Sequence, residues 1–165
     1  MTLAACSPKY NWRDYASAEA PYRVMFPGKP ASYTRSVDLD GVRVDMTMTA
    51  TEVDGAMYAV GTAQLPDAAQ APAALSAIQT ALMRNIGATA TRETSRASAS
   101  VADGQASEAS ATDVSADGVL NGVPMRLVGH VESHGRRIYQ VVVMGPAKSI
   151  EADPAEQFIS SFKVQ

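Results

Sequence analysis

The chain has 165 residues, which suits a single domain that buries ~70% of its extended-chain surface. Its net charge is -3 and its charged residues are scattered, so nucleic acid is disfavoured as a partner, because phosphate binding requires a basic face. One cysteine excludes an internal disulfide and a multi-cysteine zinc site, and no apolar run reaches the ~20 residues of a membrane span.

The stretch Leu3-Ala4-Ala5-Cys6 resembles the lipobox at which bacterial lipoprotein signals are cleaved before the cysteine is acylated. Such signals carry a charged segment and an apolar run of ~7 to 15 residues upstream, whereas only Met1 and Thr2 precede Leu3 here. Either the leader is missing from this sequence, or Cys6 is an ordinary thiol. We expect the first, with Cys6 acylated and Ser7 directing the protein to the periplasmic face of the outer membrane. Without a leader, the chain as written would stay in the cytoplasm.

Residues 1–19 are interpreted as this lipobox and a linker, and residues 20–165 as a single α+β domain. Residues 7–15 show no strand or helix periodicity, and Pro8 disfavours a helix. Three roles are open for the aromatic residues Tyr10, Trp12 and Tyr15: packing on the domain, lying at a lipid headgroup layer, or binding a partner. We favour packing of Trp12 at one end of the core, because large aromatic side chains seldom stay fully exposed.

Alternating apolar residues bounded by turns predict strands over residues 22–26, 32–39, 42–53 and 57–65. Asp40-Gly41 supplies the positive φ angles of a tight hairpin turn. Within residues 42–51 apolar side chains alternate with polar ones such as Thr49. We therefore expect one face of this strand in the core and the other in solvent.

Past Pro66 the apolar period changes to that of a helix over residues 73–86, which Asp67 or the turn at Pro72 begins and Gly87 ends. The apolar residues at this spacing are Leu75, Ile78, Leu82 and Ile86. This helix should cover the apolar face of the sheet.

Residues 88–117 are rich in Ala, Ser and Thr, a composition that alone would allow disorder. We expect strands over residues 91–101 and 105–116, joined by a turn at Asp103-Gly104. Asp117-Gly118 and Asn121-Gly122 are then expected to bracket a loop or a short extension.

The last predicted hairpin joins residues 123–132 to residues 136–144 around His134-Gly135. Residues 138–144 are apolar at almost every position, which predicts a central strand covered on both faces. Asp153 is the expected N-cap of a final helix, with Pro154 at its first position and Glu156 returning a capping bond. Its expected buried side consists of Phe158, Ile159 and Phe162. The predicted fold is an antiparallel sheet of about six to seven strands covered by a mid-chain helix and a C-terminal helix.

The order of these elements resembles the PsbP/Mog-like fold family, and more narrowly small proteobacterial lipoproteins without an assigned function. The resemblance rests on Tyr22-x-Val24-x-Phe26-Pro27-Gly28-Lys29-Pro30 at the front and Phe158-Ile159-Ser160-Ser161-Phe162-Lys163 at the back. It covers the chain from about Ala20 to the end, and it implies an αβα sandwich. It implies little about function, because one fold hosts many roles, and no functional residue is carried across.

Candidate chemistry is sparse in this sequence. His130 lies in a predicted strand and His134 at a turn, so we interpret the pair as the rim of a hairpin rather than as metal ligands, and no nucleophile elbow accompanies them. Met46 and Met48 have a spacing that would suit Cu(I), but they continue an apolar face and are best interpreted as core. We expect neither a metal nor a cofactor.

Three functional hypotheses remain. We favour a non-enzymatic accessory protein, anchored through lipid on Cys6, that binds an envelope protein, with Tyr10, Trp12 and Tyr15 as candidate docking residues. The second hypothesis is a small-ligand carrier with a pocket between helix 73–86 and the sheet. A hydrolase is the remote third, with His130 as its best residue.

Overall fold

The computed structural model describes residues 8–102 and 105–165, with side chains described for all of these except residue 90, residues 93–102 and residues 105–109. Cys6 and the expected turn at Asp103-Gly104 lie outside the described residues. Within the described ranges, no helix is long and apolar enough to cross a membrane.

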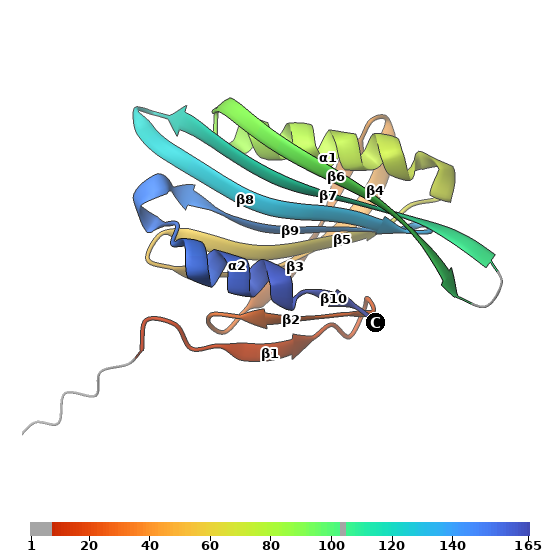
Figure 1. The fold of residues 1–165 in the computed structure, drawn as a ribbon, viewed down its shortest axis with the longest axis horizontal. Coiled ribbons are helices and arrows are strands. Elements are labelled where there is room, and N and C mark those ends of the chain that lie inside the picture. Colours follow the sequence, from red (N-terminus) through yellow and green to blue (C-terminus); the bar gives the residue numbers. More distant parts are fainter. Residues whose placement is uncertain (1–7, 103–104) are drawn as a thin grey trace, which may run out of the picture.

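The main sheet has seven antiparallel strands in the order β3-β4-β5-β9-β8-β7-β6 (Figure 1). The strands are β3 (Ala31–Leu39), β4 (Val42–Val53), β5 (Ala56–Gln64), β6 (Ala88–Ala102), β7 (Gln105–Leu120), β8 (Val123–His134) and β9 (Arg137–Pro146). All neighbours but β5 and β9 are consecutive in the chain, and the long step from β5 to β6 carries a helix across the sheet. The predicted α+β class with a large antiparallel sheet is confirmed.

A second sheet, of three antiparallel strands in the order β1-β2-β10, lies below the main sheet in Figure 1. It consists of β1 (Arg13–Ala16), β2 (Tyr22–Phe26) and β10 (Lys163–Val164). The linker expected over residues 1–19 is therefore wrong for residues 13–16, which pair with β2. Four residues are too few for alternation to be recognised in the sequence, and it is pairing with β2 that makes them a strand.

Helix α1 (Ala71–Asn85) covers one face of the main sheet and follows the short 3-10 helix η1 (Ala68–Gln70). The Asp67 carboxylate accepts a hydrogen bond from the Ala69 backbone N–H at 2.9 Å, which caps η1, and Pro72 lies in the first turn of α1. Gly87, at a φ of 59°, follows the end of the helix. The predicted mid-chain helix is thus confirmed.

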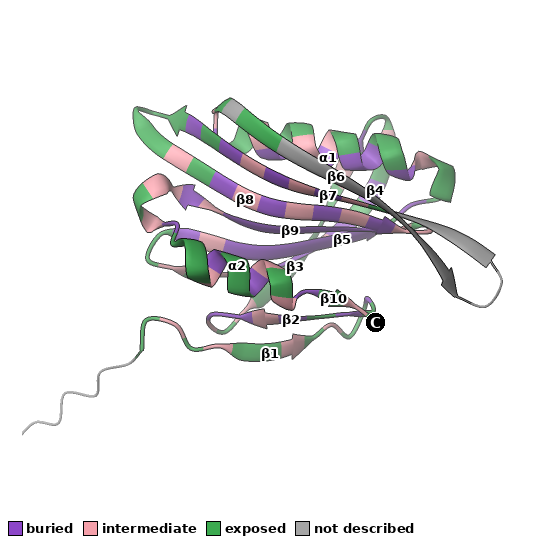
Figure 2. Ribbon diagram, viewed as in Figure 1, coloured by how far each residue is buried: buried purple, intermediate pink, exposed green. Residues whose placement is uncertain are grey.

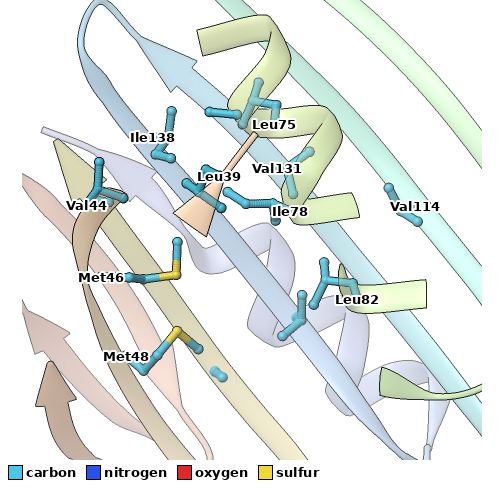
Figure 3. Close-up of a cluster of buried hydrophobic side chains, with 14 of the residues drawn as sticks. Leu39, Val44, Met46, Met48, Leu75, Ile78, Leu82, Val114, Val131 and Ile138 are labelled. Atoms are coloured by element: carbon cyan, nitrogen blue, oxygen red, sulfur yellow. The ribbon is translucent and has the colours of Figure 1, made fainter. Parts of the chain in front are cut away.

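The first core cluster fills the space between α1 and the main sheet (Figure 3). From the helix it takes Leu75, Ile78 and Leu82, and from β4 it takes Met46 and Met48, all buried. Both methionines pack among aliphatic side chains, as expected for core residues. In the part of the chain that the structure describes, no group of three or more His, Cys, Asp or Glu side chains is arranged to hold a metal ion.

The second core cluster lies on the opposite face of the main sheet. It fills the space between that face and a layer formed by the three-stranded sheet and helix α2 (Ala152–Ser161). The Phe158 ring from α2 lies 5.3 Å from the Phe26 ring and 5.4 Å from the Tyr58 ring, between centroids. Strand β9 contributes alternate residues to the two clusters, and Figure 2 shows it buried along most of its length. The predicted central strand is confirmed.

Two local predictions are wrong. Thr49 is buried rather than solvent-exposed, since the three-stranded sheet covers its face of β4. Asp153 is not the N-cap of α2: that position belongs to Glu151, and Asp153 lies in the first turn, where its charge suits the helix dipole. The Glu151 carboxylate makes no capping bond, because it accepts hydrogen bonds from Lys9 Nζ and Tyr10 Oη, each at 2.7 Å.

Candidate functional site

An open cleft of about 1070 Å³ lies between strands β7 and β8 on one side and α2 with β10 on the other. Its apolar lining includes Val128, Ile159, Phe162 and Val164. Its polar lining includes Asp113, Ser115, His130, Glu132, His134, Glu156, Arg92 and Lys163. The cleft therefore has a mixed surface, with apolar side chains from α2 and β10 facing titratable side chains of the sheet.

The titratable side chains come together through strand periodicity and register. His130, Glu132 and His134 are alternate residues of β8, so they lie on one face of the sheet. The register of β7 with β8 places Asp113 directly opposite His130. We call these four residues the histidine–carboxylate cluster.

Short contacts connect the cluster from end to end. Asp113 Oδ1 lies 2.7 Å from His130 Nδ1, and Glu132 Oε2 lies 3.5 Å from His130 Nε2 and 3.3 Å from His134 Nε2. Both ring nitrogens of His130 thus face carboxylates. This arrangement suits an imidazolium that is hydrogen-bonded to Asp113 through Nδ1 and paired with the charge of Glu132 through Nε2.

The electrostatics agree with that assignment. The Glu132 carboxylate raises the pKa of His130 above 6.5, with a smaller contribution from Asp113, and both outweigh the lowering effect of burial. Burial pushes the pKa of Glu132 upward, but the two imidazoles outweigh it and leave this pKa below 4.5. Asp113 is the closer partner of His130, yet its side chain is 48% exposed against 16% for Glu132, so water screens Asp113 more strongly.

Among the described residues, one nitrogen of the cluster and the hydroxyl of a neighbouring tyrosine have no hydrogen-bond partner. His134 Nε2 and Tyr139 Oη are both buried, and their rings meet edge-on with centroids 6.2 Å apart. His134 Nε2 is near Glu132 but lacks hydrogen-bond geometry toward it. Buried polar atoms are usually satisfied by protein, water or ligand, so these two unpaired atoms mark a polar spot in the wall beneath the cleft.

The residues predicted to dock a partner lie elsewhere. Tyr10, Trp12 and Tyr15 pack against the second core cluster; the Tyr10 and Trp12 rings stack at 6.1 Å between centroids, and Tyr15 meets Phe26 edge-on at 5.5 Å. Partial burial of Trp12 on the domain agrees with the favoured interpretation of its role. None of the three lines the cleft, and Cys6 lies outside the described residues.

Among the described residues, the first core cluster occupies the interface between α1 and the main sheet, where the sequence predicts a pocket, and the cleft lies at the other helix. The interpretation of His130 and His134 as a hairpin rim is right only for His134, since His130 lies four residues inside β8. The sequence signal that could have found the cluster is the alternation His130-x-Glu132-x-His134 within a predicted strand. No comparable signal pointed to Asp113.

The chain matches no protein-family model and no curated protein. The resemblance to the PsbP/Mog-like family therefore stays a prediction.

Replacing Glu132 with glutamine should lower the pKa of His130 toward 6.5, because the largest cause of its elevation is removed. The matched change Asp113→Asn should lower it less, because Asp113 is more exposed. An NMR titration of the His130 ring protons measures both shifts. An equal or larger shift in Asp113→Asn would contradict this ranking.

The Glu132→Gln variant should also show at which pH the cluster stabilises the fold. The raised pKa of His130 means that its contribution is complete below pH 6.5 and is lost as pH rises through the folded-state pKa. The lowered pKa of Glu132 means that its contribution is complete above pH 4.5 and is lost as pH falls through the folded-state pKa. The difference in unfolding free energy between wild type and Glu132→Gln should therefore be largest between pH 4.5 and 6.5.

Proposed function

We propose that this protein is a lipid-anchored binding protein of the bacterial envelope, which holds a segment of a partner protein in the cleft between β7–β8 and α2. The open cleft is the observation that carries the proposal. An open cleft admits an extended segment without any rearrangement of the fold. Its apolar and charged sides are complementary to an amphipathic segment.

A binding role fits the histidine–carboxylate cluster better than catalysis does. A nucleophile needs a neighbouring base with a free lone pair, whereas both nitrogens of His130 face carboxylates. A charged, hydrogen-bonded cluster instead offers donors and acceptors at fixed positions. This favours the non-enzymatic hypothesis over a hydrolase.

The anchor in this proposal rests on Leu3-Ala4-Ala5-Cys6. Expression from the full upstream reading frame, followed by membrane fractionation and mass spectrometry, tests it. We expect an acylated Cys6 in the membrane fraction, and loss of that mass and that location in Cys6→Ala. An unmodified Cys6 in the soluble fraction would refute the anchor and leave the cleft unaffected.

Site-specific photocrosslinking tests the role of the cleft. A photoreactive residue at Ser160, which lines the cleft, should give a discrete crosslinked protein in cells that contain the membrane-anchored chain. The control position is Ser76, an exposed residue of α1 on the other side of the main sheet. Identical products from the two positions, or none from Ser160, would contradict binding in the cleft.

A small-ligand carrier remains the second candidate, because a volume of about 1070 Å³ lies at the upper end of the range for small-molecule sites. Native mass spectrometry of protein purified from its own cells distinguishes the two. A bound small molecule that is lost on replacing the cleft residue Ile159 with serine favours the carrier.

A further inference from the structure

Four large hydrophobic side chains are conspicuously exposed among the described residues, and three of them lie at a single hairpin tip. Val119 and Leu120 end β7 and Val123 begins β8, with exposed fractions of 53%, 40% and 43%. The fourth, Tyr33, stands alone on the edge strand β3. We call Val119, Leu120 and Val123 the apolar tip.

The apolar tip lies at the same end of the molecule as the start of the described chain. Across the sheet, Met125 of β8 pairs with Pro146 of β9, and Met144 of β9 pairs with Met57 of β5, next to the turn that contains Asp54. Lys9 is held at that turn, with its Nζ 3.4 Å from Asp54 Oδ2. The tip and this turn therefore lie at the same end of the strands of the main sheet. They are about three strand spacings, or ~15 Å, apart.

The figures agree with this placement. In Figure 1 the β7–β8 turn and the first described residues both lie at the left end of the long axis, and Figure 2 shows the β7–β8 turn exposed. The ion pairs of Lys9 with Asp54 and Glu151, and the Tyr10–Glu151 hydrogen bond, hold the N-terminal segment in place. The chain therefore leads toward Cys6 from the same end of the molecule as the tip.

We propose that the apolar tip inserts into the lipid headgroup layer of the membrane that carries the acylated Cys6, so that this end of the domain faces the bilayer. The inference rests on the proposed anchor. Three residues of chain span at most ~10 Å, so acylation of Cys6 would hold Lys9 within that distance of the membrane surface. The tip lies at the same end of the sheet as Lys9. A tether this short therefore brings the tip within reach of the lipid.

The tip suits lipid as an occupant because it is apolar and carries little net charge. The nearest charged residues of the hairpin, Asp117 and Arg126, form an ion pair with each other at 2.9 Å. Aliphatic side chains partition into the boundary between headgroups and acyl chains, and a second contact strengthens a lipid anchor. Because no surplus cation is involved, the contact should persist in zwitterionic vesicles and at salt concentrations of about 0.5 M.

The test uses acylated protein in phosphatidylcholine vesicles. With Cys6 acylated, an Asn121→Cys variant has one free thiol, at the apex of the tip, for a polarity-sensitive fluorophore. We expect a blue-shifted emission that brominated lipids quench. The same label at Ala69→Cys, on η1 at the far end of α1, should show neither effect.

Replacing Val119, Leu120 and Val123 together with serine should abolish the quenching at position 121, while the acylated protein stays bound to vesicles. Tyr33→Ser is the matched control, an exposed hydrophobic residue away from the tip, and should leave the quenching unchanged.

Absence of quenching at position 121 in protein whose acylation and vesicle binding are verified would overturn the inference and leave the anchor standing. A blue shift without vesicles, accompanied by dimers in sedimentation, would also overturn it, by assigning the tip to a second copy of the chain. An unmodified Cys6 in the native expression experiment would instead overturn the proposed anchor, so the two failures are distinguishable.

Discussion

Replacing Phe158 with alanine is expected to lower the free energy of unfolding by about 3–5 kcal/mol. Phe158 is fully buried and joins three parts of the fold: its own helix α2, Phe26 of the three-stranded sheet and Tyr58 of the main sheet. Alanine would leave a cavity where the three meet. Urea denaturation followed by circular dichroism measures the loss, as a lower midpoint at unchanged slope.

The control is Gln157→Ala, an exposed neighbour on the same helix, which should change stability by no more than about 0.5 kcal/mol. Because α2 forms one wall of the cleft, Phe158→Ala should also reduce crosslinking from Ser160. A loss of stability below about 1 kcal/mol for Phe158→Ala would mean that Phe158 of α2 is not packed against Phe26 and Tyr58 in solution.

The strands of the main sheet could be predicted because the sequence marks their turns. Asp40-Gly41 and Asp54-Gly55 both adopt the positive φ angles that tight hairpin turns require, and each joins two predicted strands. The alternation along β4 and the apolar run of β9 then indicated which faces are buried. These signals are local, so one sequence is enough to read them.

The second layer could not be predicted, because it depends on contacts between the two ends of the chain. β10, near the end of the sequence, pairs with β2, near its start. The Glu151 carboxylate accepts hydrogen bonds from Lys9 and Tyr10 rather than from the backbone of its own helix. No local pattern reports such contacts. The expectation of a solvent-exposed Thr49 failed for the same reason, since a distant segment covers it.

The candidate site also combines features that the local sequence predicts with features that depend on contacts between distant residues. The sequence shows both histidines, but the contact of His130 with Asp113 depends on the register of β7 with β8, which brings together residues 17 positions apart. The sequence of β7 is rich in Ala, Ser and Thr, so it has no clear apolar pattern that would predict its register with β8. The cluster therefore forms only in the folded protein, through the pairing of β7 with β8.

Gly118 occupies a sterically sensitive position. Of the loop and the short extension expected between Asp117-Gly118 and Asn121-Gly122, the loop is wrong for Asp117 and Gly118, because both residues continue β7, where the glycine allows close packing. A Cβ atom at position 118 would lie 2.3 Å from the Ile86 carbonyl oxygen and 2.5 Å from that of Gly87. These are backbone atoms at the end of α1, which no side-chain movement can relieve.

We therefore expect Gly118→Ala to lower the unfolding free energy by about 3 kcal/mol, since either β7 or the end of α1 must shift. The matched variant is Gly122→Ala at the neighbouring turn, where φ is 77° but nothing lies within 4 Å of the added Cβ. That change should cost only about 1 kcal/mol of backbone strain. Urea denaturation of the two variants separates steric conflict at Gly118 from conformational strain at Gly122. A Gly118→Ala protein as stable as Gly122→Ala would show that α1 and β7 do not approach as closely as described, and the position of the apolar tip beside them would need revision.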